Sequence, residues 1–398
     1  MKPATGGYPP VFKVAPDSAK LLVLHDAGEA VAIRIAARAL PGMQKEAVVR
    51  YGMNDAVWRI LCDEGPWLNG TDLAPFPLGY FSAGLAASYL SEFMSHARQQ
   101  GVRIHALQVK VDSRYSMEGS LLQGTMRAGA LPVNLLFSAD ADASEAKLFE
   151  LACLAVATSP ADAFLRNAGS SLFRLNRNGE LLSVPDRESP VLSGAEDPLR
   201  LFDNIRPEDV VGVEEIVQKR SEVTHLGGEK LGTVKSGAEV GLSNTQKRQL
   251  HVRAVATLRD DGMKEIEVAC FNPVGSVFKL LSDDSTLAGG LGRAPSGLAY
   301  LSAAISFCYM TQLGRYAQIA KQQLHSYRIV QDTGFSPPHS VAGSAARSGC
   351  APIETAIYLD TDEPPQDSQT MVRMGEQTCY LHTACREPLK TRVQAVKC

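Results

Sequence analysis

Apolar residues alternate with polar ones in several segments of the chain and line one face of two longer segments. The alternation is clear at 30–40 (AVAIRIAARAL), at 250–258 (LHVRAVATL) and at 264–271 (KEIEVACF). A period of two residues predicts β-strands. The longer segments, 77–99 and 297–323, instead carry Ala, Ser and Gly along an apolar face. That pattern predicts helices whose backbones approach a packing partner closely.

The predicted elements follow one another in the same order twice. Each half begins with alternating strands, continues through an extended run into a loop rich in Gly and Pro, and then reaches the long helix. A pair of strands and a closing helix complete the order, at 105–115, 130–140 and 144–158 in the first half and at 326–335, 351–360 and 365–383 in the second. This order predicts the α+β class, with antiparallel sheets packed around long central helices.

The two long helices belong to a repeat with an offset of 220 residues. Residues 80–90 (YFSAGLAASYL) match 300–310 (YLSAAISFCYM) at both tyrosines and at the Ser-Ala pair. The same offset aligns Asp63 with Asp283, Gly70 with Gly290, His105 with His325, Pro132 with Pro352 and Arg166 with Arg386. Chance similarity between two Ala-rich helices does not extend to such residues. We therefore expect two fused copies of one domain of about 140 residues, at 25–167 and 245–398, each of ordinary domain size.

Composition narrows the class of protein. The net charge is −3 and the charged residues are mixed rather than blocked, so neither a nucleic-acid partner nor an anionic membrane surface is expected. The start of the chain is polar and contains prolines, unlike a signal peptide, and no apolar run is long enough to span a bilayer. We expect a cytoplasmic protein. The sequence also contains no G-x-S-x-G, Walker A or H-E-x-x-H motif.

The segment between the two copies, 168–244, is rich in Gly, Ser and charged residues. Within it, 196–220 (EDPLRLFDNIRPEDVVGVEEIVQKR) has the pattern of one or two amphipathic helices. The segment is too long for a simple connection, so we expect either a wrapping linker or a lid.

Two of the eight cysteines differ between the copies in a way that suggests chemistry. Cys308 aligns with Ser88 and Cys379 with Ser159, so both thiols are replaced together in the first copy. A peroxidatic thiol reacts as the thiolate, and a second thiol within reach condenses with the resulting sulfenic acid to form a disulfide. Such a bond requires Cα atoms about 4.4–6.8 Å apart, which side-by-side packing of the two helices would provide.

Thiolate formation requires a neighbouring cation or base. Arg259, in the predicted hairpin turn, and Arg293, in the loop before the long helix, are candidates because the first copy has Ala39 and Leu73 at the aligned positions. His382 follows Cys379 by three residues and could act as a base or cation on the same helix face. The alternatives are solvated surface arginines and a structural histidine. A metal site in the Cys-x-x-His-x-x-Cys run at 379–385 is disfavoured because the ligands diverge along one helix.

The run SDD…GGLGRAPSGLAYLSAAISFCY, followed by a second cysteine about seventy residues later in a closing helix, resembles the OsmC/Ohr family, the osmotically inducible and organic hydroperoxide resistance proteins. The resemblance covers nearly the whole chain as two fused copies. It implies a thiol peroxidase in which Cys308 is the peroxidatic and Cys379 the resolving residue, with no cofactor. It also implies an apolar hydroperoxide as substrate and a lipoyl- or thioredoxin-type dithiol as reductant. The fused pair would mimic the intertwined family dimer, and a further homodimer of the chain is possible.

The sequence departs from the family at two positions. No acidic residue stands about ten residues before Cys308, where the chain has Ser296, Gly297 and Leu298, and Tyr380 rather than proline follows Cys379. Two alternatives therefore stay open. The thiol chemistry could act on a non-peroxide electrophile by hydrolysis or transfer, or the fold could bind an apolar small molecule without catalysis.

Overall fold

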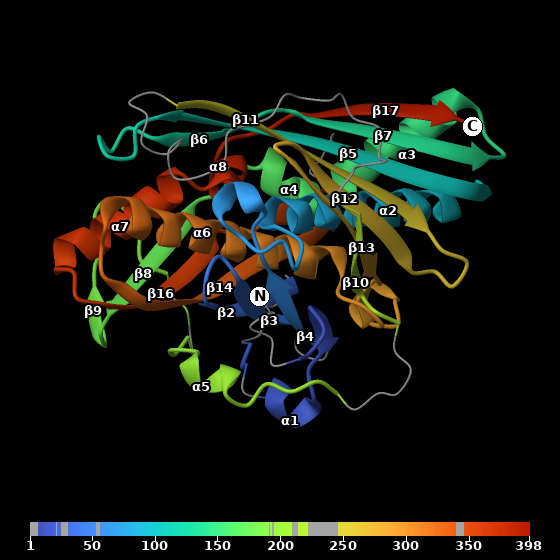
Figure 1. The fold of residues 1–398 in the computed structure, drawn as a ribbon. Helices are drawn as coiled ribbons and strands as arrows, with labels where there is room; N and C mark the ends of the chain where they lie inside the picture. The colour runs from blue at the N-terminus through green and yellow to red at the C-terminus, as the bar shows by residue number, and fades with distance from the viewer. Residues whose placement is uncertain are drawn as a thin grey trace.

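The computed structural model describes residues 7–20, 22–24, 31–52, 56–190, 192, 195–208, 214–221, 246–339 and 346–398. Within these residues the chain has a mixed α+β fold with two largely antiparallel sheets and eight α-helices. The α+β expectation is confirmed at this level. The long helices α2 (Pro77–Gln99) and α6 (Gly297–Ala320) lie between the two sheets (Figure 1).

The first sheet combines strands from both halves of the chain. Its order is β1 (Val11–Lys13), β4 (Val57–Cys62), β3 (Lys45–Tyr51), β2 (Val31–Ala39), β14 (Leu324–His339), β16 (Ile353–Thr361), β8 (Ser171–Arg177) and β9 (Glu180–Leu182), with β15 (Arg347–Cys350) paired to β14. The two halves meet where β2 pairs with β14 in antiparallel register, Ile35 opposite Gln331.

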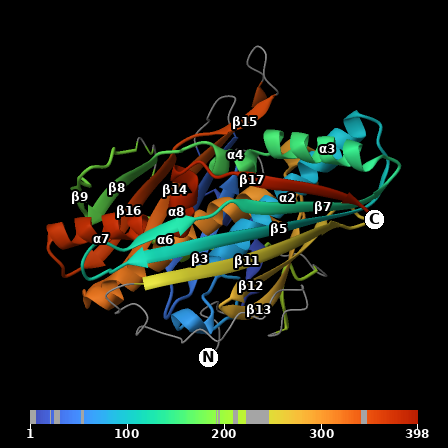
Figure 2. The same cartoon turned by 90° about the horizontal axis from the view of Figure 1, so that it is seen from above.

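The second sheet has the reciprocal composition. Its order is β10 (Val217–Ser221), β13 (Val274–Ser282), β12 (Lys264–Asn272), β11 (Gln246–Leu258), β5 (Ile104–Gly119), β7 (Val133–Ala141) and β17 (Thr391–Lys397), with β6 (Arg127–Ala130) paired to β5. Here the halves meet between β11 and β5, Ala254 opposite Val111. Figure 2 shows β11, β5, β7 and β17 side by side above the helices. Each half therefore completes the sheet of the other.

The central helices cross at small residues, as the sequence predicts. A Cβ atom added to Gly84 would lie 2.5 Å from the carbonyl oxygen of Gly297, which leaves no room for a side chain at the crossing. Tyr80 lies one turn before Gly84 on α2, and its ring stacks on the ring of Tyr300 with centroids 5.5 Å apart. Each tyrosine hydroxyl donates a hydrogen bond to the strand that precedes its own helix, at Leu61 and Leu281. The close crossing and these bonds fix the two helices relative to both sheets.

Both closing helices are broken rather than continuous. The first consists of α3 (Glu145–Thr158) and α4 (Pro160–Arg166), and the second of α7 (Pro365–Gln377) and α8 (Tyr380–Arg386). The continuous helix expected over 365–383 is therefore wrong. Ser159 and Cys379 have extended backbone conformations at the two breaks, where they are the N-cap residues of α4 and α8.

The segment between the halves forms strands more than helices. The one or two helices expected over 196–220 reduce to α5 (Leu199–Phe202) among the described residues, and Val217–Ser221 forms an edge strand instead. Residues 209–213 and 222–245 lie outside the described residues. The strand β8 pairs in parallel with β16, and β17 pairs in parallel with β7 in the same way. β8 is therefore the counterpart of β17, and the elements of the first half continue beyond residue 167. Asp197 accepts hydrogen bonds from the buried Arg328 and holds the segment against the outer face of the first sheet.

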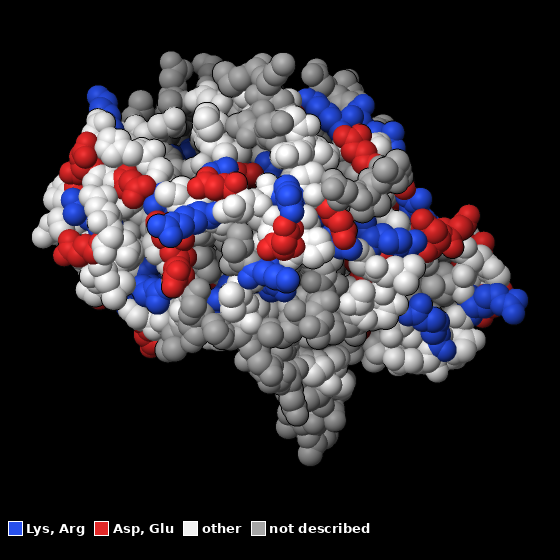
Figure 3. All heavy atoms as spheres, turned by 90° about the horizontal axis from the view of Figure 1, so that it is seen from below, with Lys and Arg blue, Asp and Glu red and all other residues white. Residues whose placement is uncertain are grey.

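Two surface properties bear on partners. On the face shown in Figure 3, acidic and basic side chains are interspersed, and neither sign forms a large patch. Among the described residues, no single helix is both long and apolar enough to cross a membrane, although α3 and α4 pass that test when joined across their 74° bend.

Candidate active site

The two cysteines selected from the sequence come together in the structure. Cys308 lies in the middle of α6, and Cys379 lies at the break before α8. Both are buried and neither is in a disulfide. Burial and then the interaction with Cys308 raise the pKa of the Cys379 thiol well above its ordinary value, so the two cysteines are neighbours. Cys379 therefore stays protonated near neutral pH.

The serine pair of the first half has the same arrangement. The hydroxyl oxygens of Ser88, on α2, and Ser159, at the break before α4, are 2.9 Å apart and share a hydrogen bond. The Ser159 hydroxyl also accepts from the backbone N–H of Asp162, which caps α4. The two halves thus hold the same pair of positions as neighbours, with sulfur in one half and oxygen in the other.

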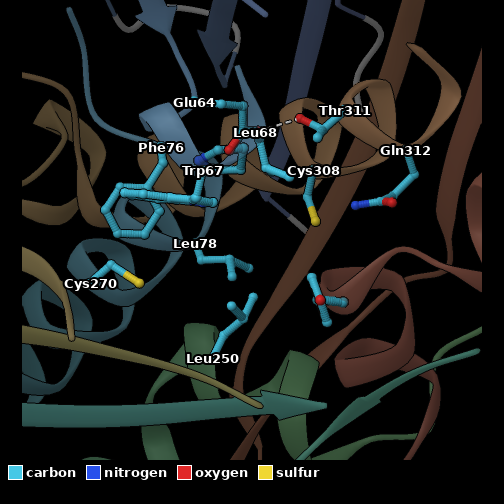
Figure 4. Close-up of a pocket in the computed structure, with 12 residues that line it drawn as sticks. Glu64, Trp67, Leu68, Phe76, Leu78, Leu250, Cys270, Cys308, Thr311 and Gln312 are labelled. Atoms are coloured by element: carbon cyan, nitrogen blue, oxygen red, sulfur yellow. Dashed lines mark hydrogen bonds between the residues drawn. The ribbon is translucent and has the colours of Figure 1, made fainter. Parts of the chain in front are cut away.

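A cavity of about 40 Å³ borders Cys308. Figure 4 shows the sulfur of Cys308 pointing into it. Residues from both halves form its wall: Glu64, Trp67, Leu68, Phe76, Pro77, Leu78, Leu250, Cys270, Cys308, Thr311, Gln312 and Tyr380. Trp67 and Leu68 come from the short helix η1 (Pro66–Leu68), which belongs to the first half. Residues of the half with the serine pair therefore form part of the wall around Cys308.

Glu64 is the one carboxylate in the wall of this cavity, and sequence reasoning missed it. Its side chain accepts a 2.5 Å hydrogen bond from the hydroxyl of Thr311, and the ammonium group of Lys45 is 3.7 Å away. Burial raises its pKa above the usual range for glutamate. Glu64 belongs to the half opposite Cys308, and the 220-residue offset aligns it with Asp284, another carboxylate.

The two candidate arginines lie elsewhere. Arg259 forms ion pairs with Glu214 and Asp261 on the surface, and Arg293 pairs with Asp283. Neither belongs to the wall of the cavity, which contains no Lys or Arg. The expectation that they stand beside Cys308 is therefore not met, because each is held by carboxylates of its own loop and of the strand before it. The hairpins of the two halves can also be aligned by strand register, because Leu258 pairs with Lys264 and Ala39 pairs with Lys45. The residue after Leu258 is Arg259 and the residue after Ala39 is Leu40, so Arg259 corresponds to Leu40.

His382 does lie beside the thiol pair. Its Nδ1 is 3.3 Å from the sulfur of Cys379, and its ring is enclosed by Phe173 and Tyr309. Burial, with a smaller contribution from the charge of Arg386, lowers its pKa to about 3. The imidazole is therefore neutral near pH 7 and can exchange a hydrogen bond with Cys379, but it is not a cation that stabilises a thiolate.

The burial of His382 gives a testable pH dependence. Between about pH 6.5 and pH 3 the unfolded chain binds a proton at this residue that the folded protein excludes, so stability falls as pH falls through that range. We expect about 2 kcal/mol of stability from this source to be lost between about pH 7 and pH 5. Urea unfolding of wild type and His382→Asn at several pH values should show the smaller pH dependence in the variant.

The exposed His105, which pairs with Asp142, provides the control for that measurement. His105→Asn should show the same loss of stability toward acid pH as wild type. Parallel pH profiles for wild type and His382→Asn would contradict the buried neutral state of His382.

Three other buried thiols lie near the site. Burial raises the pKa of Cys270 to about 12 and raises those of Cys62 and Cys385 well above the ordinary value. Such thiols remain protonated and unreactive near neutral pH. Over the ranges that the structure describes, no group of three His, Cys, Asp or Glu side chains is arranged to hold a metal ion.

Comparisons with known proteins give limited results. No family model matches the chain, and no curated protein matches it. Among solved structures, an OsmC-like hydroperoxide resistance protein from Jannaschia sp. CCS1 is similar to 33% of this chain, over 83% of its own length, with 21% sequence identity and a TM-score of 0.20.

Proposed function

We propose that the chain is a thiol peroxidase that reduces organic hydroperoxides through Cys308 and Cys379. The observation that carries the proposal is that two buried thiols are neighbours, of which Cys308 faces a cavity. A buried pair of neighbouring thiols is suited to forming a disulfide, and the cavity gives one of them access to a small reactant. The resemblance of the sequence to the OsmC/Ohr proteins supports the same chemistry.

The first step is attack of the Cys308 thiolate on the hydroperoxide. Cys308 loses its proton to solvent when the thiolate forms. The sulfur then forms a bond to the terminal oxygen of RO–OH, the O–O bond breaks, and the departing RO⁻ takes a proton from solvent and leaves as the alcohol. The thiol of Cys379 can donate a hydrogen bond to the Cys308 thiolate, because Cys379 keeps its proton. Gln312 follows Cys308 by one helical turn, and its side-chain amide nitrogen points toward the sulfur (Figure 4). These two donors replace the cation that the cavity lacks.

The second step forms the disulfide. Cys379 attacks the sulfur of the Cys308 sulfenic acid, the S–S bond forms, and the hydroxyl leaves as water with the proton from Cys379. The neutral imidazole of His382, 3.3 Å from the sulfur of Cys379, is placed to receive and pass on that proton. An external dithiol, of lipoyl or thioredoxin type, then restores both thiols by disulfide exchange.

The wall of the cavity favours an apolar substrate. Seven of its residues have aromatic or aliphatic side chains: Trp67, Leu68, Phe76, Pro77, Leu78, Leu250 and Tyr380. A volume of about 40 Å³ accommodates the –O–OH group, so the alkyl part must displace some of these side chains. Apolar contacts would then stabilise the bound alkyl group and disfavour hydrogen peroxide, which has no such group.

Treatment with one equivalent of tert-butyl hydroperoxide should convert Cys308 and Cys379 into a disulfide. Peptide mapping by mass spectrometry under non-reducing conditions should recover the peptide linked through these two residues. The exposed Cys153 and Cys398 are internal controls and should remain free under the same conditions. Recovery of both buried cysteines as free thiols, or their linkage to other cysteines, would overturn the proposed resolving role.

A further inference from the structure

The cavity that Cys308 borders is called the thiol cavity below. A second cavity lies at the corresponding positions of the first half. Its volume is about 180 Å³. One face of α2 contributes Ser88, Ser91, Glu92 and Ser95, and the loop before α6 contributes Asp284 and Ser285. Ser88 thus borders a larger and more polar space than Cys308 does.

The 220-residue offset shows what distinguishes the two cavities. Thr311 donates to Glu64 in the thiol cavity, and Ser91 donates to Asp284 at 2.8 Å in the second. The next residue along the helix is Gln312 in the thiol cavity, whereas the second cavity has Glu92. The second cavity therefore has an additional carboxylate at the same helical position.

The charge of Glu92 is not balanced by an ion pair. No Lys, Arg or His among the described residues lies within ion-pairing distance of Glu92, which accepts one hydrogen bond from Thr158 at 2.7 Å. Asp284 differs, because the ammonium group of the buried Lys264 is 2.8 Å from it. Arg98 also borders the cavity, but its side chain is exposed, so its charge is screened by solvent.

Ser285 provides an independent sign that a ligand belongs here. The residue is 4% exposed, it borders the cavity, and its hydroxyl is buried with no hydrogen-bond partner. A buried hydroxyl without a partner costs free energy that a ligand can recover by hydrogen bonding to it. The loop therefore holds a buried hydroxyl without a partner beside the cavity that Glu92 also borders.

We infer that this second cavity binds a small hydroxylated amine in its ammonium form. The ammonium group would pair with Glu92, and the ligand hydroxyl would bond to Ser285. A volume of about 180 Å³ accommodates a compound of the size of ethanolamine without movement of the wall. The site is separate from the thiol pair and does not depend on peroxidase activity.

Isothermal titration of the full chain with ethanolamine tests the inference. We expect saturable 1:1 binding to wild type, and Glu92→Gln, which gives the second cavity the side chain of Gln312, should weaken it about tenfold or more. Glycerol, which has similar size but no charge, should bind more weakly than ethanolamine to wild type and equally to both proteins. Absence of saturable ethanolamine binding to wild type would overturn the inference.

Two further variants separate binding from folding. Glu150→Gln makes the same chemical change at an exposed glutamate on α3 and should leave the affinity unchanged. Ser285→Ala removes only a hydroxyl that has no partner, so it should fold normally and weaken ethanolamine binding several-fold. Equal affinity in wild type, Glu92→Gln and Ser285→Ala would show that the ammonium group binds elsewhere.

Discussion

Replacement of Cys308 by serine is expected to lower the reduction of tert-butyl hydroperoxide to the uncatalysed rate. A serine hydroxyl is not ionised near neutral pH and does not cleave the O–O bond, so the first step is lost while the shape of the cavity is kept. Serine at the corresponding position of the first half, Ser88, shows that the fold accepts it within hydrogen-bonding distance of its partner. The measurement is steady-state peroxide consumption with a dithiol reductant in excess.

Cys379→Ser should separate the two steps of the same reaction. The variant keeps Cys308 and a hydroxyl donor beside it, so we expect one rapid turnover per chain. Without a resolving thiol, excess peroxide should then convert Cys308 to sulfinic acid, which mass spectrometry detects. Cys153→Ser, at an exposed position on α3, should cycle as wild type does. Full turnover in Cys308→Ser would exclude the peroxidase mechanism proposed for this pair.

The parts of the site that the sequence predicted are those defined within one half. The proximity of Cys308 and Cys379 followed from the joint replacement by Ser88 and Ser159 and from adjacent helices. The close helix crossing followed from small residues such as Gly84, because a helix with a small-residue face packs backbone to backbone. These features depend on local pattern and on the repeat, both of which can be read from a single chain.

The exchange of strands between the halves could not be read in this way. The strand β2 has the same alternating pattern whether it pairs with β5 of its own half or with β14 of the other, so periodicity does not select the partner. Glu64 was missed for this reason, since only the exchanged arrangement brings its loop against Cys308. The ion pairs of Arg259 and Arg293 likewise depend on loop geometry that a strand pattern does not specify.

The broken closing helices show a further limit. In the first half, Pro160 follows Ser159, whose side chain caps the new helix, so the break has a local signal. In the second half Tyr380 follows Cys379 and no proline is present, yet the chain breaks at the same place. Packing therefore sets this break, and packing puts Cys379 at the end of a helix facing Cys308.

A double variant, Ser88→Cys with Ser159→Cys, should place a disulfide in the first half. The two hydroxyl oxygens are already 2.9 Å apart, so the sulfurs need little backbone movement to reach bonding distance. The bond would close a loop of 71 residues, for which the chain-entropy model gives about 4 kcal/mol of stabilisation. Urea unfolding of the oxidised and reduced forms measures the difference, and neither single variant should show it.

The same variant tests whether contact alone makes a peroxidatic site. Glu92 occupies the position that Gln312 has beside Cys308, and a carboxylate there disfavours a thiolate at residue 88. We therefore expect diamide to form the new disulfide readily and tert-butyl hydroperoxide to form it slowly, and the further change Glu92→Gln should speed the peroxide reaction. Equal rates with and without Glu92 would show that the amide at 312 does not contribute to the reactivity of Cys308. Failure of diamide to form the bond would show that the two pairs are not held in equivalent geometry.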